Sequence, residues 1–259
     1  MLPREDLLKG VENRETIARV IDRADQALKT WDVVQTDFLS PPELAEVQQS
    51  LGRLTEVQLV SWGGYPQAER NRLAIARADL PLETAQVELA ALEIAGNFLF
   101  DPASHRDFMG ALLGTGIVRE KVGDIIVLGE RGGQAIVAPD LVEFLSMSLT
   151  QVRSVPVKTQ PIELSELKIR EPKKKELTTV EASLRLDAVA SAGFGMSRSK
   201  MADIIESGDV RVNWKETSSA SYQVKSGDLI AIRGKGRVEV GEVAVTKKDR
   251  YRVQLTRFV

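Results

Sequence analysis

The chain has 259 residues, a hydrophobic fraction of 43% and a formal net charge of −2, which predicts a globular protein of two or three domains. It has no cysteine and one histidine, His105, which excludes disulfides, iron–sulfur clusters and cysteine–histidine zinc sites, so we expect no metal and no cofactor. No apolar run approaches the ~20 residues of a membrane-spanning helix and no secretory signal is present, so we expect a cytoplasmic protein without membrane insertion.

Residues 1–82 are predicted to form a helical N-terminal domain. Apolar residues at three- and four-residue spacing predict an amphipathic helix over residues 15–27. A second helix is expected after Ser40, because Glu43 follows that serine at the spacing of a capping box. Residues 69–78 are also expected to be helical.

Residues 83–168 are predicted to form an α+β domain. The expected order is strand, helix, strand, strand, helix, strand, over residues 86–100, 105–113, 124–128, 134–138, 141–149 and 151–162. The glycine pair in Glu130-Arg131-Gly132-Gly133 indicates a hairpin between the third and fourth elements. This order is the split βαβ pattern.

Residues 169–178 are expected to be an exposed linker, since Pro172 and three consecutive lysines after it fit neither helical nor strand periodicity. The final domain is then predicted to span residues 179–259. It should begin with a helix over residues 184–192, closed by Gly193, and a second helix capped by Ser197.

Residues 210–215 alternate between apolar and polar side chains, which predicts an amphipathic strand. The core face is expected to hold Val210, Val212 and Trp214. The outward face is expected to hold Arg211, Asn213 and Lys215.

The charge of the chain is divided unevenly. Residues 1–167 hold 16 lysines and arginines against 25 acidic residues, whereas residues 168–259 hold 19 against 12. A basic C-terminal domain on an acidic body is the arrangement expected when one domain contacts a polyanion.

An ordered set of short motifs lies in the basic part of the chain: Arg185-Leu186-Asp187, Ser197-Arg198-Ser199-Lys200, Val210-Arg211-Val212-Asn213 and Val224-Lys225-Ser226-Gly227-Asp228. This set resembles the S-four RNA-binding domain over about residues 179–240. The resemblance implies two helices on a small bent sheet that recognises structured RNA. The RNA-binding positions that it implies are Arg185, Ser197, Arg198, Ser199, Lys200, Arg211, Asn213 and Lys215. One departure is Trp214, where the S-four family usually has glycine in a tight turn.

These residue types suit a phosphate backbone. A helix N-terminus that starts at Ser197 offers unpaired amides to a phosphate, while Arg198 and Lys200 add positive charge. The guanidinium of Arg211 can bind two phosphate oxygens at once, as a lysine cannot. Because no aromatic pair is expected on this surface, folded RNA is favoured over stacked single-stranded bases.

Longer motifs extend the resemblance to nearly the whole chain. They are Trp62-Gly63-Gly64-Tyr65, Ala68-Glu69-Arg70, residues 105–114 and residues 116–125. They are similar to those of the YlmH-like proteins, called photosystem II S-four domain proteins in cyanobacteria and plastids. The resemblance implies a middle domain shaped like an RNA-recognition motif and work in association with the ribosome.

The sequence therefore predicts a non-enzymatic protein that binds structured RNA, with ribosomal RNA as the expected target and a ribosomal protein as a possible partner. The alternative is an assembly or repair factor for photosystem II whose acidic body acts through protein contacts. A lesser alternative is an RNA-modifying enzyme, because Arg185-Leu186-Asp187 resembles the catalytic triplet of pseudouridine synthases. Too few residues follow Asp187 to form the catalytic domain of such an enzyme.

Overall fold

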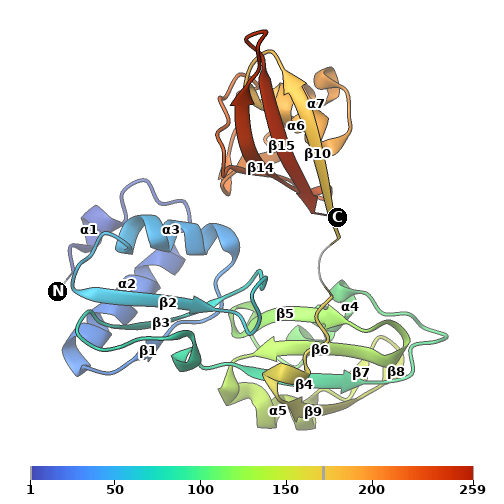
Figure 1. Ribbon diagram of the computed structural model, residues 1–259. Helices are drawn as coiled ribbons and strands as arrows, with labels where there is room; N and C mark the ends of the chain where they lie inside the picture. Colours follow the sequence, from blue (N-terminus) through green and yellow to red (C-terminus); the bar gives the residue numbers. More distant parts are fainter. Residues whose placement is uncertain (1, 171–172, 259) are drawn as a thin grey trace. The chain divides into compact units, whose positions relative to one another are not determined.

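A computed structural model describes residues 2–170 and 173–258. The chain divides into two compact units, Met1–Ile169 and Arg170–Val259 (Figure 1). Both units combine helices with antiparallel sheets, which confirms the predicted α+β class. Within the described ranges, every helix is too short or too polar to span a bilayer.

The first part of the larger unit is a three-stranded sheet with helices packed against it. The sheet has the order β1-β3-β2 and consists of β1 (Val34–Gln35), β2 (Val57–Trp62) and β3 (Arg72–Arg77). The helices are α1 (Arg4–Leu7), α2 (Arg14–Thr30) and α3 (Pro41–Leu51). The core between α2 and the sheet contains the fully buried side chains of Ile17, Ile21 and Ile75.

Two of the three helices predicted in this region are confirmed. Helix α3 begins after Ser40, whose backbone N–H donates to the Glu43 carboxylate at 2.7 Å in a capping box. The helix predicted over residues 69–78 is wrong, because strand β3 pairs there with both β1 and β2. Five of its six residues are buried, so the strand lacks the alternation that would have identified it.

The second part of the larger unit is a four-stranded antiparallel sheet of order β5-β6-β4-β9. Its strands are β4 (Ala90–Ala95), β5 (Val122–Val127), β6 (Gly132–Val137) and β9 (Lys158–Ile162). Helices α4 (His105–Gly114) and α5 (Val142–Ser148) pack on one face through residues such as Phe108, Leu112 and Leu145. This order and the two helices agree with the split βαβ pattern.

Short elements join the strands of the larger unit. A two-stranded hairpin is formed by β7 (Gln151–Val152) and β8 (Val155–Pro156). The 3-10 helices are η1 (Thr84–Gln86), η2 (Arg119–Lys121), η3 (Gly129–Arg131), η4 (Pro139–Leu141) and η5 (Leu164–Glu166).

The face of β6 opposite to the helices is covered by the chain itself. Gln134 is 1% exposed; its side chain donates to the carbonyl of Glu166 at 3.1 Å and accepts from the backbone N–H of Lys168 at 2.7 Å. Ile136 is fully buried, and a side chain at Gly64 would clash with it. RNA-recognition motifs stack bases on the corresponding face of their sheet, so this surface is occupied at its centre.

The longer sequence motifs meet where the two parts of this unit join. The carboxylate of Asp124 accepts hydrogen bonds from the Tyr65 hydroxyl at 2.7 Å and from the backbone N–H groups of Glu69 at 2.7 Å and Arg70 at 3.1 Å. The Arg70 side chain donates to the carbonyl of Val122 at 2.9 Å. These motifs therefore form a structural joint.

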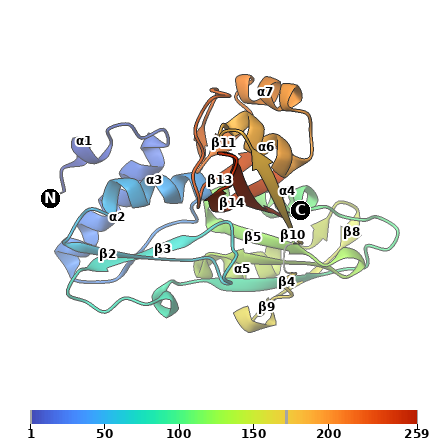
Figure 2. The same cartoon turned by 45° about the horizontal axis from the view of Figure 1, so that its top comes forward.

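The smaller unit is a six-stranded antiparallel sheet with two helices packed on one face (Figure 2). The strands, in the order β10-β15-β14-β13-β11-β12, are β10 (Lys174–Glu181), β15 (Tyr251–Phe258), β14 (Gly236–Val245), β13 (Leu229–Ile232), β11 (Val210–Val212) and β12 (Lys215–Glu216). The helices are α6 (Leu186–Phe194) and α7 (Arg198–Glu206). The core between them contains side chains such as Val189, Met201, Ile230 and Val238.

Two predicted boundaries in this unit differ from the structure. Residues 174–178, expected to lie in a linker, belong to β10 and pair with β15; Pro172 of that segment lies outside the described residues. Helix α6 closes at Gly195, which has a φ of +68°, and not at Gly193. Gly193 is instead buried, and a side chain there would clash with Val238.

Candidate nucleic-acid interface

Helix α7 presents an exposed N-terminus. Ser197 caps it, and its hydroxyl oxygen accepts the backbone N–H of Lys200 at 3.3 Å. The hydroxyls of Ser197 and Ser199 are 3.3 Å apart. All four residues from Ser197 to Lys200 are exposed, so two hydroxyls, an arginine and a lysine are accessible to solvent at this helix N-terminus.

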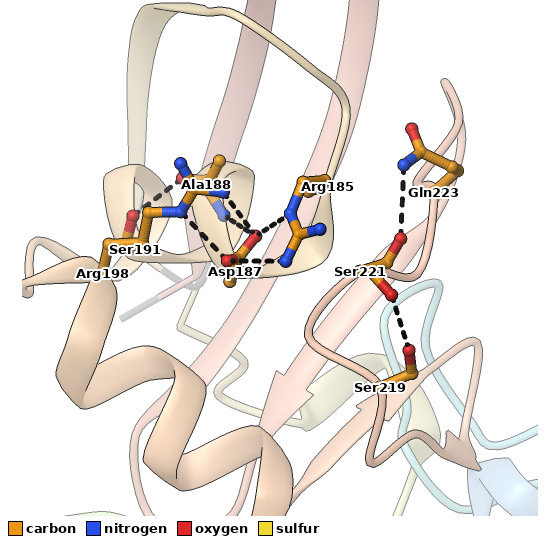
Figure 3. Close-up of polar contacts among 8 residues, drawn as sticks. All are labelled: Arg185, Asp187, Ala188, Ser191, Arg198, Ser219, Ser221 and Gln223. Carbon is orange, nitrogen blue, oxygen red and sulfur yellow. Dashed lines mark hydrogen bonds and ion pairs between the residues drawn. The ribbon is translucent and has the colours of Figure 1, made fainter.

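Arg185 and Arg198 are held by one buried carboxylate (Figure 3). Asp187 accepts two hydrogen bonds from Arg185, at 3.1 and 3.3 Å, and two from Arg198, at 3.0 and 3.2 Å. The backbone N–H of Ala188 donates to the same carboxylate at 2.9 Å. Only 8% of the Asp187 side chain is exposed, against 37% for Arg185 and 54% for Arg198. Asp187 therefore fixes two arginines at the solvent boundary.

The contacts of this cluster shift the pKa values of Asp187 and Arg198. Burial raises the pKa of Asp187, but hydrogen bonds from Arg185 and Arg198 outweigh it and lower that pKa below its usual range. The hydrogen bond and charge of Asp187 raise the pKa of Arg198. Asp187, with a lowered pKa and two guanidinium partners, acts here as a positioning group.

A polar loop lies beside the start of α6, as Figure 3 shows. The backbone N–H of Leu186 donates to the carbonyl of Tyr222 at 2.8 Å, and Arg185 forms an isolated bridge with Gln223. Residues Ser219 and Ser221 of this loop are exposed, with their hydroxyls 3.1 Å apart. Apart from that bridge, residues 222–225 form no strand, and the sequence patterns did not single out this loop as a candidate site.

The strand predicted over residues 210–215 is interrupted by a turn. Asn213 and Trp214 have φ angles of +49° and +68°, as in a type I′ hairpin turn, and β12 pairs back onto β11. The Asn213 amide donates to Asp228 at 2.8 Å and accepts the backbone N–H of Leu229 at 2.9 Å. Both functions of that amide are therefore used within the fold.

The turn changes the predicted faces. Val212 and Lys215 are directly opposite each other, so their side chains leave the same face of the hairpin, and Lys215 does not share the face of Arg211. Trp214 is half-buried and belongs to the turn, so its predicted place in the core is wrong. Arg211 is exposed, as expected.

The candidate residues thus fall into two groups. Arg185 and the residues from Ser197 to Lys200 are joined through Asp187, which sequence reasoning considered only as a catalytic residue. The sequence feature that could have identified the role of Asp187 is the spacing Arg-x-Asp, followed by a second arginine at the N-terminus of the next helix. Arg211, Asn213 and Lys215 belong to the hairpin.

Arg211→Ala and Val212→Ala are expected to damage different properties. Arg211 is exposed, so its loss should change the free energy of unfolding by less than about 0.5 kcal/mol while weakening RNA binding. Val212 is 4% exposed, so its truncation should cost roughly 1–3 kcal/mol and leave phosphate contacts intact in the folded fraction. Thermal unfolding and RNA titration of both variants measure this; melting by Arg211→Ala would contradict the assignment.

Three family models match consecutive parts of the chain. The model described as "YlmH, N-terminal" matches residues 12–80, and "Putative RNA-binding domain in YlmH" matches residues 83–166. The model described as "S4 domain" matches residues 184–230.

Individual proteins show the same relationship. The chain is 36% identical over 241 residues to the ribosome-associated protein quality control protein P2 of Bacillus subtilis, covering 90% of this chain and 93% of that relative. It is 42% identical over 60 residues to the small ribosomal subunit protein uS4 of Desulfotalea psychrophila, covering 23% of this chain and 29% of that relative. The solved structure of cell division protein ylmH from Streptococcus pneumoniae has a similar fold, with a TM-score of 0.54 and 20% identity, covering 62% of this chain and 96% of that chain. With three matching models and a relative aligned over nine-tenths of its length, the chain belongs to the YlmH family.

Proposed function

We propose that the chain is a non-enzymatic protein that docks on ribosomal RNA through the smaller unit. The observation that carries this is the α7 N-terminus, where Ser197, Ser199 and Lys200 are exposed beside two arginines oriented by Asp187. Guanidinium groups held by a carboxylate lose little conformational freedom when they bind phosphate. Arg185, Arg198 and the helix N–H groups can contact neighbouring phosphates of one folded RNA.

The names of its relatives favour the ribosome as the location of that RNA. One relative is named a ribosome-associated protein quality control protein, and another, which matches over 60 residues, is a small ribosomal subunit protein. A ribosomal target would also place the protein in the cytoplasm.

The larger unit is proposed to position the protein or to contact a partner protein. Gln134 and Ile136 leave no room for bases at the centre of its four-stranded sheet, since the chain's own segments cover them. We further propose that this unit consists of two domains that meet at residue 82. A contact with a photosystem assembly protein stays a prediction that no observation here favours.

Lys200→Ala tests the proposed site in the full-length protein. Each phosphate contact adds about 0.7–0.9 to the slope of log affinity against log salt, so this variant should lower the slope for ribosomal subunits by about that amount. Lys29→Ala is the matched control, because Lys29 is also an exposed helical lysine and belongs to α2 of the larger unit.

The measurement is co-sedimentation with purified ribosomal subunits over a salt series, repeated after ribonuclease treatment. Wild-type protein should sediment with untreated subunits only. Sedimentation that survives ribonuclease, or an equal change of slope in both lysine variants, would place the contact outside the α7 N-terminus.

A further inference from the structure

The face of the smaller unit's sheet that points away from the helices carries a continuous cross-strand row. Its members are directly opposite one another in neighbouring strands: Arg211 with Ala231, Ala231 with Arg237, Arg237 with Phe258, and Phe258 with Lys174. Directly opposite residues in an antiparallel sheet project from the same face. The row crosses five strands, or about 19 Å at the usual spacing of about 4.8 Å between neighbours.

Val212, Ile230 and Val238, the sequence neighbours of this row, are buried in the core below the helices. The row itself therefore lies on the outer face. Ala231 stands between Arg211 and Arg237 in this row, and its small side chain adds little bulk between them.

Two aromatic rings on this face are each paired with a cation. The guanidinium carbon of Arg237 is 5.7 Å from the centre of the Trp214 ring, and the amino nitrogen of Lys174 is 5.8 Å from the centre of the Phe258 ring. Both distances are within the range of a cation–π interaction. Trp214 and Phe258 are half-buried, so both residues stay partly accessible to solvent.

The backbone of Trp214 gives an independent indication of function. A φ of +68° is unfavourable for a bulky residue, and the second central position of a type I′ turn strongly prefers glycine. Glycine would stabilise this turn, so the tryptophan is retained at a cost in folding energy. Strained residues of this kind concentrate at binding sites.

We propose that this outer face is a stacking platform for unpaired nucleotides of RNA, with Trp214 and Phe258 as base-stacking residues and Arg211, Arg237 and Lys174 as phosphate contacts. The inference rests on the proposed function and adds a second class of RNA to it. Aromatic rings interleaved with cations along a sheet are the combination that binds single strands without sequence preference.

Acidic residues limit the platform to one row. Glu216, directly opposite Arg211 in β12, closes the row at that end, while Glu176 and Glu239 stand two residues beyond Lys174 and Arg237 in the same strands and so project from the same face. Their charges repel phosphates, which directs a bound strand along the row.

The decisive variant is Trp214→Gly in the full-length protein. It removes the ring and relieves the backbone, so the variant should fold with equal or greater stability. Its affinity for a fluorescein-labelled uridine decamer should nevertheless fall roughly 5- to 100-fold, the loss of one stacked base. Anisotropy titration at low salt and thermal unfolding of the same samples measure the two effects.

Trp31→Gly is the matched control. Trp31 also has a positive φ, at +63°, and also carries an arginine over its ring, with Arg77 at 3.6 Å, but it lies in the larger unit. Its loss should leave decamer affinity unchanged. Binding of the decamer should quench tryptophan fluorescence in the wild type and in Trp31→Gly, and not in Trp214→Gly.

The outcomes separate this inference from the proposed function. Lys200→Ala should weaken binding to ribosomal subunits and leave decamer affinity nearly unchanged, whereas Trp214→Gly should weaken decamer binding. Full decamer affinity in Trp214→Gly overturns the platform and leaves the α7 site standing. Loss of stability in Trp214→Gly also overturns the platform, because the ring would then be a packing residue. The proposed function is overturned if neither Lys200→Ala nor Trp214→Gly weakens binding to ribosomal subunits.

Discussion

Asp187→Ala is expected to reduce the preference of the protein for its folded RNA target by roughly 5- to 100-fold over an unstructured competitor. Arg185 and Arg198 each lose two hydrogen bonds and become free to rotate, so they no longer match the spacing of phosphates on one folded RNA. The net charge of the interface rises at the same time, so nonspecific binding to the uridine decamer should be retained or increased. Competition titrations of ribosomal subunits against the decamer measure this ratio.

The same substitution should cost about 1–3 kcal/mol of unfolding free energy, a moderate value because both arginines remain partly solvated. A second variant, Asp187→Asn, tests how the contribution of the Asp187 charge to the unfolding free energy depends on pH. The folded-state pKa of Asp187 is lowered, so its contribution is present above the unfolded pKa and disappears as the pH falls through the folded one. The stability difference between wild type and Asp187→Asn should therefore shrink in acid; a constant difference would assign Asp187 a packing role.

Local patterns predicted those elements whose residues have a single exposed face. The amphipathic helix α2 and the capping box at Ser40 are determined by residues within one turn of each other. The split βαβ order of the middle region was also visible, because each of its elements has its own boundary signal.

Two strands that depend on distant pairing were not predicted. Strand β10 begins with Lys174 and Lys175, and its exposed, charged residues become a strand only because β15, about 80 residues later, supplies hydrogen-bond partners. Strand β3 was mistaken for a helix because it lies at the centre of its small sheet and is buried on both faces. Neither fact is encoded within the segment itself.

The candidate site shows the same limit. The positions from Ser197 to Lys200 follow from helix capping, which is local. The role of Asp187 depends on the return of the chain from α6 to α7, which brings Arg198 onto a carboxylate 11 residues earlier. The platform residue Phe258 joins the row only through strand register, which sequence periodicity does not provide.

Asp124→Ala is expected to have the largest effect on the stability of the larger unit, about 2–4 kcal/mol. The substitution leaves the Tyr65 hydroxyl and the N–H groups of Glu69 and Arg70 without the carboxylate that they share. It also removes a negative charge that faces Arg70 and Arg119. Burial, together with the charge of Arg70, already lowers the pKa of Arg119 to about 10, so two crowded guanidinium groups would lose a neutralising partner.

Urea unfolding of the full-length protein tests this, with Asp140→Ala as the control. Asp140 also pairs with a cation, Lys121, at 3.3 Å, but 61% of its side chain is exposed, so its removal should cost less than about 0.5 kcal/mol. Because the chain forms two compact units, Asp124→Ala should shift the unfolding transition of the larger unit alone. The tryptophan fluorescence of Trp31 and Trp62 reports unfolding of the larger unit, while that of Trp214 reports unfolding of the smaller unit. Equal effects of the two aspartate variants, or a matching shift in the smaller unit, would show that the joint between the YlmH motifs does not hold the larger unit together.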